Sequence, residues 1–303
     1  MTRPTRNSAL RHWLALAAAA ILTLLPARGQ DTATVVLDAN VKSEGLVCPT
    51  LSMFTLDAGY ASLHDSYLTP ITYDGMNLAP RYEAMRAAWF RPRSWTWQLQ
   101  AGVDYCYAEN PAGNNEMHRL LADVSFSLQH RWRKVLLGCV DLSAGPMFTL
   151  RAGATYDPAN SNNPVSARAH AALGVTGMAT WNTRMWRQPV TLRYQAQLPV
   201  AGAFFAPEYN ESYYEVYLGN DHNLAHMAWW GNRLDMTNYL GADLHLGRTI
   251  LRVGYRSSIE CWSVNSLHVH DVTHSLVIGI GGEFLGLSPR ARAASPAIVS
   301  PLY

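Results

Sequence analysis

Charged residues in general, and lysine in particular, are scarce in this chain. Charged residues make up 15% of its 303 positions, against roughly 25% in a typical soluble domain. Lys42 and Lys134 are the only lysines, so almost every basic residue is an arginine. A water-facing sheet usually carries Lys and Glu, whereas the rigid fork of arginine suits packed polar interiors. The net charge of +2 gives no reason to expect a nucleic-acid partner.

Long apolar runs are missing after residue 30. A membrane-spanning helix needs about 18 or more apolar residues, so a mature chain that enters a membrane must do so as strands. The one marked apolar run, 13–25, follows three arginines and precedes small residues at 27–29. This pattern predicts a signal peptide over 1–29 that is cleaved on export.

Cysteine is also scarce, and its spacing is uninformative. The four cysteines are Cys48, Cys106, Cys139 and Cys261. They form no C-x-x-C unit and match no metal-binding pattern. We expect four small buried residues, although an exported protein could oxidise them. No metal or cofactor is expected.

What the chain does contain is alternation with a period of two. In the stretch 251–256, Leu251, Val253 and Tyr255 alternate with Arg252 and Arg256. Such alternation is typical of a strand with one apolar and one polar face. The same pattern recurs along the chain and predicts strands at about 51–61, 78–90, 95–107, 120–129, 135–154, 168–182, 190–198, 238–246, 251–260 and 275–284.

The connections between these strands alternate between short and long. The expected tight turns are 91–94, 131–134, 185–188 and 247–249, and the longest connections include 207–236 and 261–272. Short periplasmic turns opposite longer extracellular loops are typical of outer-membrane barrels. We therefore predict an all-β fold: an antiparallel transmembrane β-barrel of about 10–12 strands.

Aromatic residues support a lipid-facing outer surface. In the strand 95–107, Trp95 and Trp97 stand at one end of the apolar face, Tyr105 and Tyr107 at the other, with aliphatic residues between them. This is the arrangement of the aromatic girdles of a membrane barrel. The expected partners are outer-membrane lipid and the barrel-assembly machinery that inserts such proteins.

The predicted organisation has four parts. These are a signal peptide (1–29), an N-terminal periplasmic extension (30–50), the barrel (51–286) and a flexible C-terminal tail rich in Pro, Ala and Ser (287–303). A soluble exported β-sandwich is the architectural alternative. Sandwich strands centre on about five or six residues, whereas these strands reach the roughly ten residues needed to cross a bilayer.

The polar faces predict a charge-balanced lumen. The candidate lumen network comprises Asp57, Glu83, Asp104, Asp123, Arg193, Asp243, His245, Arg252, Arg256 and Glu260. A barrel of eight strands is filled by its own side chains, and only one near sixteen holds a wide channel. The sequence therefore favours a narrow or plugged barrel, either a small-solute pore or a structural or binding barrel.

The long connection after residue 207 is the richest stretch for recognition. Its candidate binding residues are Glu208, Glu211, Tyr213, Tyr214, Glu215, Asn232, Arg233 and Asp235. Acids interleaved with aromatics could form a lid, or the site of an enzyme acting on lipid or lipopolysaccharide. No Ser–His–acid spacing diagnostic of such an enzyme is present. His268, His270 and Asp271 lie close in sequence but are a weak metal signal.

Four stretches of the chain resemble a family of uncharacterised Gram-negative outer-membrane barrels that is known as a domain of unknown function. The first two are 66–70, and 161–164 followed by Ala167. The third is 192–195, leading through Pro199 to 204–205 and 207–209 with 211–215, and the fourth is 232–235 with 238–239 and 252–255. The resemblance implies export and a barrel. It brings no activity, so no catalytic residue is carried over.

Overall fold

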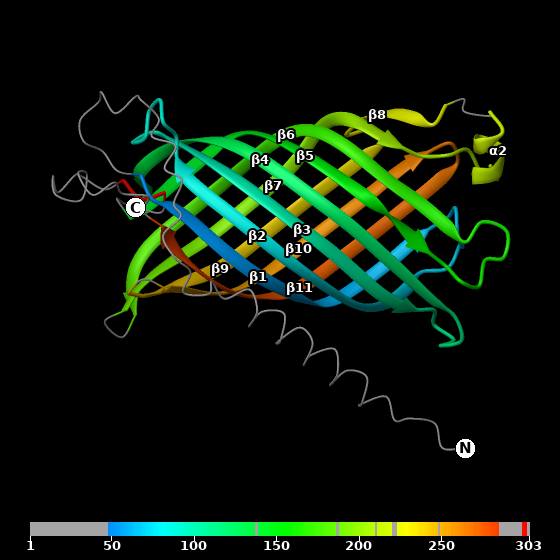
Figure 1. Cartoon of the computed structure of the whole chain (residues 1–303), viewed down its shortest axis with the longest axis horizontal. Helices are drawn as coiled ribbons and strands as arrows, with labels where there is room; N and C mark the ends of the chain where they lie inside the picture. The colour runs from blue at the N-terminus through cyan, green and yellow to red at the C-terminus, as the bar shows by residue number, and fades with distance from the viewer. Residues whose placement is uncertain are drawn as a thin grey trace, which may run out of the picture. The chain divides into compact units, whose positions relative to one another are not determined.

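The chain folds into one sheet that closes on itself. The computed structural model describes residues 48–136, 139–185, 188–209, 211–219, 223–247, 249–284 and 299–301. Its elements are β1 (Thr50–Asp65), β2 (Tyr73–Ala87), β3 (Trp95–Glu109), β4 (Glu116–Leu136), β5 (Val140–Tyr156), β6 (Val165–Met185), β7 (Gln188–Phe205), α2 (Tyr213–Tyr217), β8 (Ala225–Trp229), β9 (Arg233–Leu246), β10 (Thr249–Val264) and β11 (Leu267–Phe284). Neighbouring strands pair antiparallel around the wall, and β11 returns to pair with β1, which closes the barrel of tilted strands in Figure 1.

Strands β8 and β9 share one position in the wall. β8 pairs with the upper part of β7, from Ala201 to Phe205, and β9 pairs with its lower part, from Val190 to Gln197. The eleven strands therefore make a barrel of ten positions, within the predicted range of about 10–12 strands. Asn232 holds the break between β8 and β9, because its side chain accepts from the Trp229 N–H at 2.9 Å and donates to the Met227 carbonyl at 2.7 Å. The alternative of a soluble sandwich is wrong, since one closed sheet has no second layer.

The outside of the wall is apolar and the inside is polar. Large apolar side chains exposed on the outer surface include Phe54, Val103, Leu120, Val124, Phe126, Leu150, Leu173, Val175, Leu240, Val253, Leu276 and Ile278. The inward-facing residues of the same strands are largely polar or charged and buried. Strands other than β8 have 14 to 21 residues, beyond the roughly 9–11 that cross a bilayer. The distribution of apolar and polar residues is therefore the reverse of that in a soluble protein, and the apolar outer surface suits lipid.

Within the described parts of the chain, no helix has the length and apolar character that crossing a bilayer would require.

The two ends of the barrel differ in their connections. At the turn end, β2–β3, β4–β5, β6–β7 and β9–β10 are joined by the short segments 88–94, 137–139, 186–187 and 247–248. At the loop end, 157–164 and 206–232 are the longest connections, and α2 lies beyond the wall there (Figure 1). The segments 66–72 and 110–115 are no longer than 88–94, and β10 joins β11 through a tight turn at this end, so the predicted asymmetry is confirmed only in part.

The predicted last loop, 261–272, is wrong. β10 continues to Val264, a turn of two residues follows at Asn265 and Ser266, and β11 starts at Leu267. Both turn residues have positive φ, 51° and 60°, as the tightest hairpin turns require. The alternation here has the opposite sense, because Trp262, Leu267 and Val269 are buried inside.

The predicted turn at 131–134 is wrong as well. β4 continues through these residues to Leu136, and Arg131 is buried in the interior. Strand β5 accordingly starts at Val140. The basic residues at 131, 133 and 134 suggested a surface turn, but inward-facing arginine is satisfied by acids inside the barrel.

Apolar side chains fill both ends of the lumen. The loop-end cap consists of Ala61, Leu63, Tyr67, Leu68, Tyr73, Cys106, Ala108, Met117, Phe204, Ala206, Ala228, Trp262, Leu267 and Val269. A smaller turn-end cluster consists of Leu51, Met53, Met85, Met178 and Ile250. Between these two clusters the interior is polar.

The signal peptide, almost all of the N-terminal extension (30–50) and most of the tail (287–303) lie outside the described residues. The domain boundaries stay predictions there. Within the tail, Val299, Ser300 and Pro301 are described and all three are buried, which differs from the expectation of a loose segment at those positions.

None of the four cysteines, all of them described by the structure, forms a disulfide. Cys106 is buried, Cys48 and Cys261 are half-buried, and Cys139 is exposed. The expectation of four buried residues holds for Cys106 alone.

A charge placed on the outer wall should destabilise the barrel in lipid. Ile278 is 59% exposed on β11, and Ile278→Arg should lower the free energy of unfolding by about 2–4 kcal/mol if the site lies near the bilayer midplane. Urea titration in phospholipid vesicles measures this change. Ile71→Arg is the matched control, because Ile71 is 45% exposed in the connection 66–72. Equal effects of the two variants would contradict a lipid-facing wall.

Candidate functional site

All ten residues of the predicted lumen network point into the barrel. Asp57, Glu83, Asp104, Arg193, Asp243, His245, Arg252 and Glu260 are buried, and the side chains of Asp123 and Arg256 are each 13% exposed. The structure separates them into layers along the barrel axis.

The layer nearest the turn end is a bridge centred on Glu83. Arg193 binds this carboxylate through both terminal nitrogens, at 2.8 and 3.0 Å, and Arg252 also donates to it. Arg252 in turn holds Asp243 bidentately at 2.6 and 2.7 Å. Glu83 lies on β2 and Arg193 on β7, five positions apart around a barrel of ten. The bridge therefore spans the full width of the lumen.

Glutamine amides extend this bridge sideways. Gln98 donates to Glu83 at 2.6 Å and exchanges hydrogen bonds with Gln195 on the facing wall, at 3.2 and 2.8 Å. Two residues further along each strand, toward the loop end, Gln197 donates to Gln100 at 2.8 Å across the lumen. We call Glu83, Gln98, Arg193, Gln195, Asp243 and Arg252 the turn-end bridge.

The ring of Tyr239 supports the arginines of this region. The guanidinium carbons of Arg193, Arg256 and Arg252 lie 5.0, 5.2 and 5.7 Å from its centroid. These distances are within the range of cation–π attraction, which is strongest where water is excluded. Tyr239 thus contributes to the charge balance without carrying a charge.

Above the bridge, Arg81 gathers the acids of neighbouring strands. Its Nη1 donates to both oxygens of Asp123, at 2.8 and 3.0 Å, and its Nε lies 3.3 Å from Asp57. Arg256 donates to Asp57 at 2.6 Å. Asp104 accepts from Asn77 at 3.1 Å.

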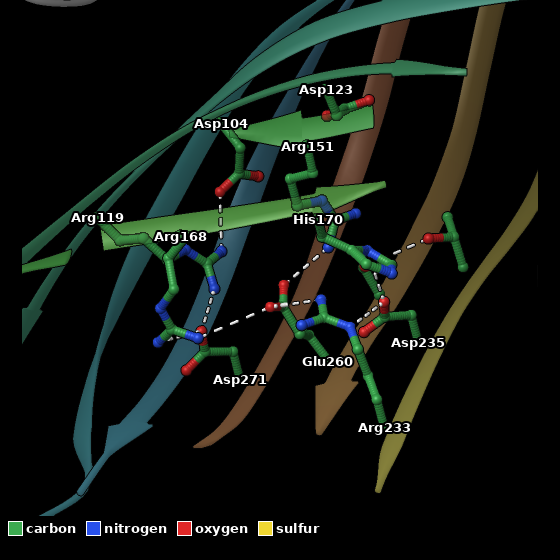
Figure 2. Close-up of polar contacts among 12 residues, drawn as sticks. Asp104, Arg119, Asp123, Arg151, Arg168, His170, Arg233, Asp235, Glu260 and Asp271 are labelled. Carbon is green, nitrogen blue, oxygen red and sulfur yellow. Dashed lines mark hydrogen bonds and ion pairs between the residues drawn. The ribbon is translucent and has the colours of Figure 1, made fainter. Parts of the chain in front are cut away.

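A second charged layer lies under the loop-end cap and appears in Figure 2. This loop-end network consists of Asp65, Arg119, Arg151, Arg168, His170, Arg233, Asp235, Glu260 and Asp271. Glu260 accepts from Arg151 at 2.8 Å and from Arg233 at 2.9 Å. Arg168 on β6 reaches Asp65 on β1 at 3.0 Å, again across the whole lumen.

A cavity of about 70 Å³ lies between the two charged layers. At roughly 10–15 Å³ for each water, it has room for about five water molecules. Asp57 Oδ1 and Asp235 Oδ1 are buried without a protein partner, and both residues line this cavity. Water in the cavity can satisfy these oxygens, so its chemistry is that of a hydrated polar chamber.

The chemistry available in the lumen is ion pairing and hydrogen bonding. His170 Nδ1 lies 3.3 Å from Asp235 and Thr191 Oγ1 lies 2.9 Å from His245 Nε2. Among the residues that the structure describes, no group of three or more His, Cys, Asp or Glu side chains is placed to hold a metal ion. His268 and His270 are exposed while Asp271 is buried inside, so this suspected metal trio is split between the two faces of the wall.

Sequence reasoning missed Arg119, Asp65 and Asp271 as lumen residues. Arg119 donates to Asp271 at 3.0 Å and to Asp104 at 2.8 Å. The signal was available in the period of two. Arg119 has the parity of Asp123, Asp65 that of Asp57, and Asp271 that of Ser275, so extending each alternation past the expected strand end would have placed them inside.

The predicted mouth residues do not form one site. Arg233 and Asp235 belong to β9, are buried in the loop-end network and bind each other at 2.8 Å. Asn232 holds the break before β9. Glu208, Tyr214 and Glu215 are exposed, whereas Glu211 is buried and Tyr213 half-buried. Their predicted role in binding stays a prediction.

The loop-end segment around α2 is tied to three other parts of the barrel. The Tyr67 hydroxyl donates to the Glu211 carbonyl at 2.7 Å, and the Tyr213 hydroxyl accepts from the Ala167 N–H at 2.6 Å. Asn265 donates to the Pro207 carbonyl at 3.3 Å. Burial raises the pKa of the Tyr67 phenol, and nearby Tyr213 and acids raise it further. The neutral hydroxyl therefore persists as a donor well into alkaline pH.

Glu215 has a structural role in this segment. Its carboxylate accepts from the Ser212 N–H at 2.8 Å, while Ser212 Oγ accepts from the Glu215 N–H at 3.3 Å. This capping box begins α2. The hydrogen bond from the Ser212 backbone lowers the pKa of Glu215.

Removing the charge of Glu83 should leave two buried arginines without a full counter-charge. Glu83→Gln keeps the shape but leaves Arg193 and Arg252 short of a counter-charge, and should lower the free energy of unfolding by about 3–5 kcal/mol. Denaturant titration of the refolded protein measures this. Glu116→Gln is the control, because the Glu116 side chain is 48% exposed beside His118, and should cost less than about 1 kcal/mol. A near-neutral Glu83→Gln would show that the bridge is not what holds the lumen.

Tyr67→Phe should loosen the segment around α2. The variant loses the bond to Glu211, which is worth about 0.5–1.5 kcal/mol, so the amides of Glu211 to Val216 should exchange hydrogen faster. Tyr209→Phe is the control, since Tyr209 is 61% exposed. Unchanged exchange in Tyr67→Phe would show that the segment is held by other contacts.

Comparison with solved structures finds distant likenesses. The outer-membrane protease OmpT of Escherichia coli matches at 6% identity with a TM-score of 0.43, over 78% of this chain and 97% of that one. The transport unit of the autotransporter AIDA-I of Escherichia coli matches at 8% identity with a TM-score of 0.38, over 83% of this chain and 94% of that one. The translocator domain of the autotransporter NalP of Neisseria meningitidis matches at 9% identity with a TM-score of 0.36, over 92% and 97%. Likeness at these values carries no functional argument.

No curated protein sequence matches the chain. One family model does, over residues 20–291, which is most of the chain. The resemblance drawn from the sequence is consistent with this match, and the closed barrel is the fold found here. The chain belongs to the family described as "Protein of unknown function (DUF3316)".

Proposed function

We propose that this protein is a sealed, non-conducting barrel of the outer membrane, with a structural rather than a transporting interior. The observation that carries the proposal is the turn-end bridge. Glu83 and Arg193 stand on opposite walls and meet in the middle of the lumen at 2.8 and 3.0 Å. An open path along the axis would have to pass through this contact.

Moving the bridge aside would be costly. Glu83, Arg193, Asp243 and Arg252 are each at most 5% exposed, and separating one member of a buried ion pair costs about 3–5 kcal/mol. The loop-end network crosses the lumen a second time through Arg168 and Asp65. Apolar clusters close both ends, and ions do not cross dry apolar layers readily.

The membrane assignment rests on the wall. The outer surface exposes aliphatic and aromatic side chains all along strands long enough to cross a bilayer, and the predicted signal peptide supplies the route of export. Outer-membrane lipid and the assembly machinery are the partners that such a barrel implies.

Exchange with solutes is then confined to the loop end. Loops held by a rigid scaffold are where binding residues concentrate, and Glu208, Tyr214 and Glu215 are the exposed members of the predicted mouth set. The cavity lies below the loop-end cap, which keeps it inaccessible to large substrates.

The purified full chain should be electrically silent in a planar bilayer. The test requires proof of insertion, which flotation with vesicles and a heat-modifiable band on electrophoresis provide. Swelling of proteoliposomes in a small sugar should likewise equal that of empty vesicles. Discrete conductance steps from the inserted wild-type chain would overturn the sealed lumen and establish a narrow pore.

A further inference from the structure

Residues 299–301 are buried at the turn end of the barrel, although β11 already ends at Phe284. Val299 is 7% and Ser300 4% exposed, and Pro301 is buried as well. The Ser300 hydroxyl donates to Glu283 Oε1 at 2.5 Å. Arg131 Nη1 donates to the Ser300 carbonyl at 3.2 Å.

The two strands that hold Ser300 stand far apart in the wall. Arg131 is on β4 and Glu283 on β11, four positions apart around the ten. Both lie near the strand ends at the short turns. Because Ser300 alone makes both contacts, this residue lies between the two strands, within the turn-end mouth rather than along one edge of it.

The chemistry of the segment matches burial in a polar mouth. Valine supplies an apolar side chain, and serine is satisfied at both its hydroxyl and its carbonyl. Proline has no N–H, so its burial leaves no backbone donor unpaired. Arg131 is itself fixed, because its Nη2 donates to Asp141 at 3.2 Å.

We propose that residues 299–301 form a strap over the turn-end mouth, and that this mouth binds the chain's own segment through Arg131 and Glu283. The site recognises a backbone carbonyl through Arg131 and a hydroxyl through Glu283. This goes beyond the sealed lumen, since the bridge would block ions with or without the strap.

Cross-linking in the full chain tests the strap directly. In a background with Cys48, Cys139 and Cys261 changed to Ser, Glu283→Cys with Ser300→Cys should be joined efficiently by a short bifunctional thiol reagent. Phe284→Cys with Ser300→Cys is the matched control. Phe284 is the next residue but faces outward and is 58% exposed, so this pair should remain largely unlinked. Equal linking in both pairs, or none in either, would overturn the proposal.

A second measurement leaves Glu283 intact. In a chain with Cys48 and Cys261 changed to Ser, Val299→Cys should react with a maleimide at least about tenfold more slowly than the exposed native Cys139, because reaction requires local opening. Adding Arg131→Ala should release the strap and bring the two rates together. Adding Arg133→Ala should leave the two rates as different as before, since Arg133 is exposed on the same strand.

Similar rates at Val299→Cys and Cys139 in the otherwise unchanged chain would overturn the strap. Neither experiment depends on whether the lumen conducts. A conducting barrel with a cross-linked strap would contradict the sealed lumen alone, and a silent barrel without the cross-link would contradict the strap alone.

Discussion

The contact between Glu83 and the arginines that approach it from other strands is the interaction on which the interior depends. A carboxylate buried this deeply is tolerable only when paired, and here Arg193 and Arg252 share it. Arg252 then requires Asp243, and both arginines lie over Tyr239. Each member therefore needs the others in place. Because the pair joins opposite walls, it crosses the whole width of the lumen.

The order of layers along the axis protects these ion pairs. Apolar side chains fill the lumen at both ends, and the charged layers and the cavity lie between them. Excluding water lowers the local dielectric constant, which strengthens attraction between well-placed opposite charges and raises the cost of leaving one unpaired. The barrel is thus a polar core within an apolar wall, closed at either end by apolar residues.

The loop end shows where alternation misleads. In the middle of the wall, apolar side chains face out, but near the loop end the apolar residues Trp262 and Leu267 turn inward and His268 faces out. The period of two continues through this reversal, but the apolar residues now lie on the inner face instead of the outer face. Assigning the faces by polarity ended β10 too early, began β11 too late and left Asp271 in a loop. Continuing the in–out alternation of positions, whatever the polarity of the residues, places Asp271 in the lumen.

Alternation along single strands was enough to predict a barrel of about 10–12 strands and the inward direction of residues such as Glu83, Arg193 and Arg252. It is a local property, because successive side chains on a strand point to opposite faces. Only closure of the sheet decided which charges meet. β2 and β7 face each other because they lie five positions apart in the closed order of ten. Closure also brought Arg233 and Asp235 from the expected mouth into the lumen and placed Ser300 between Arg131 and Glu283. The contacts Glu83–Arg193 and Arg131–Ser300 join residues 110 and 169 positions apart, and no local sequence pattern records them.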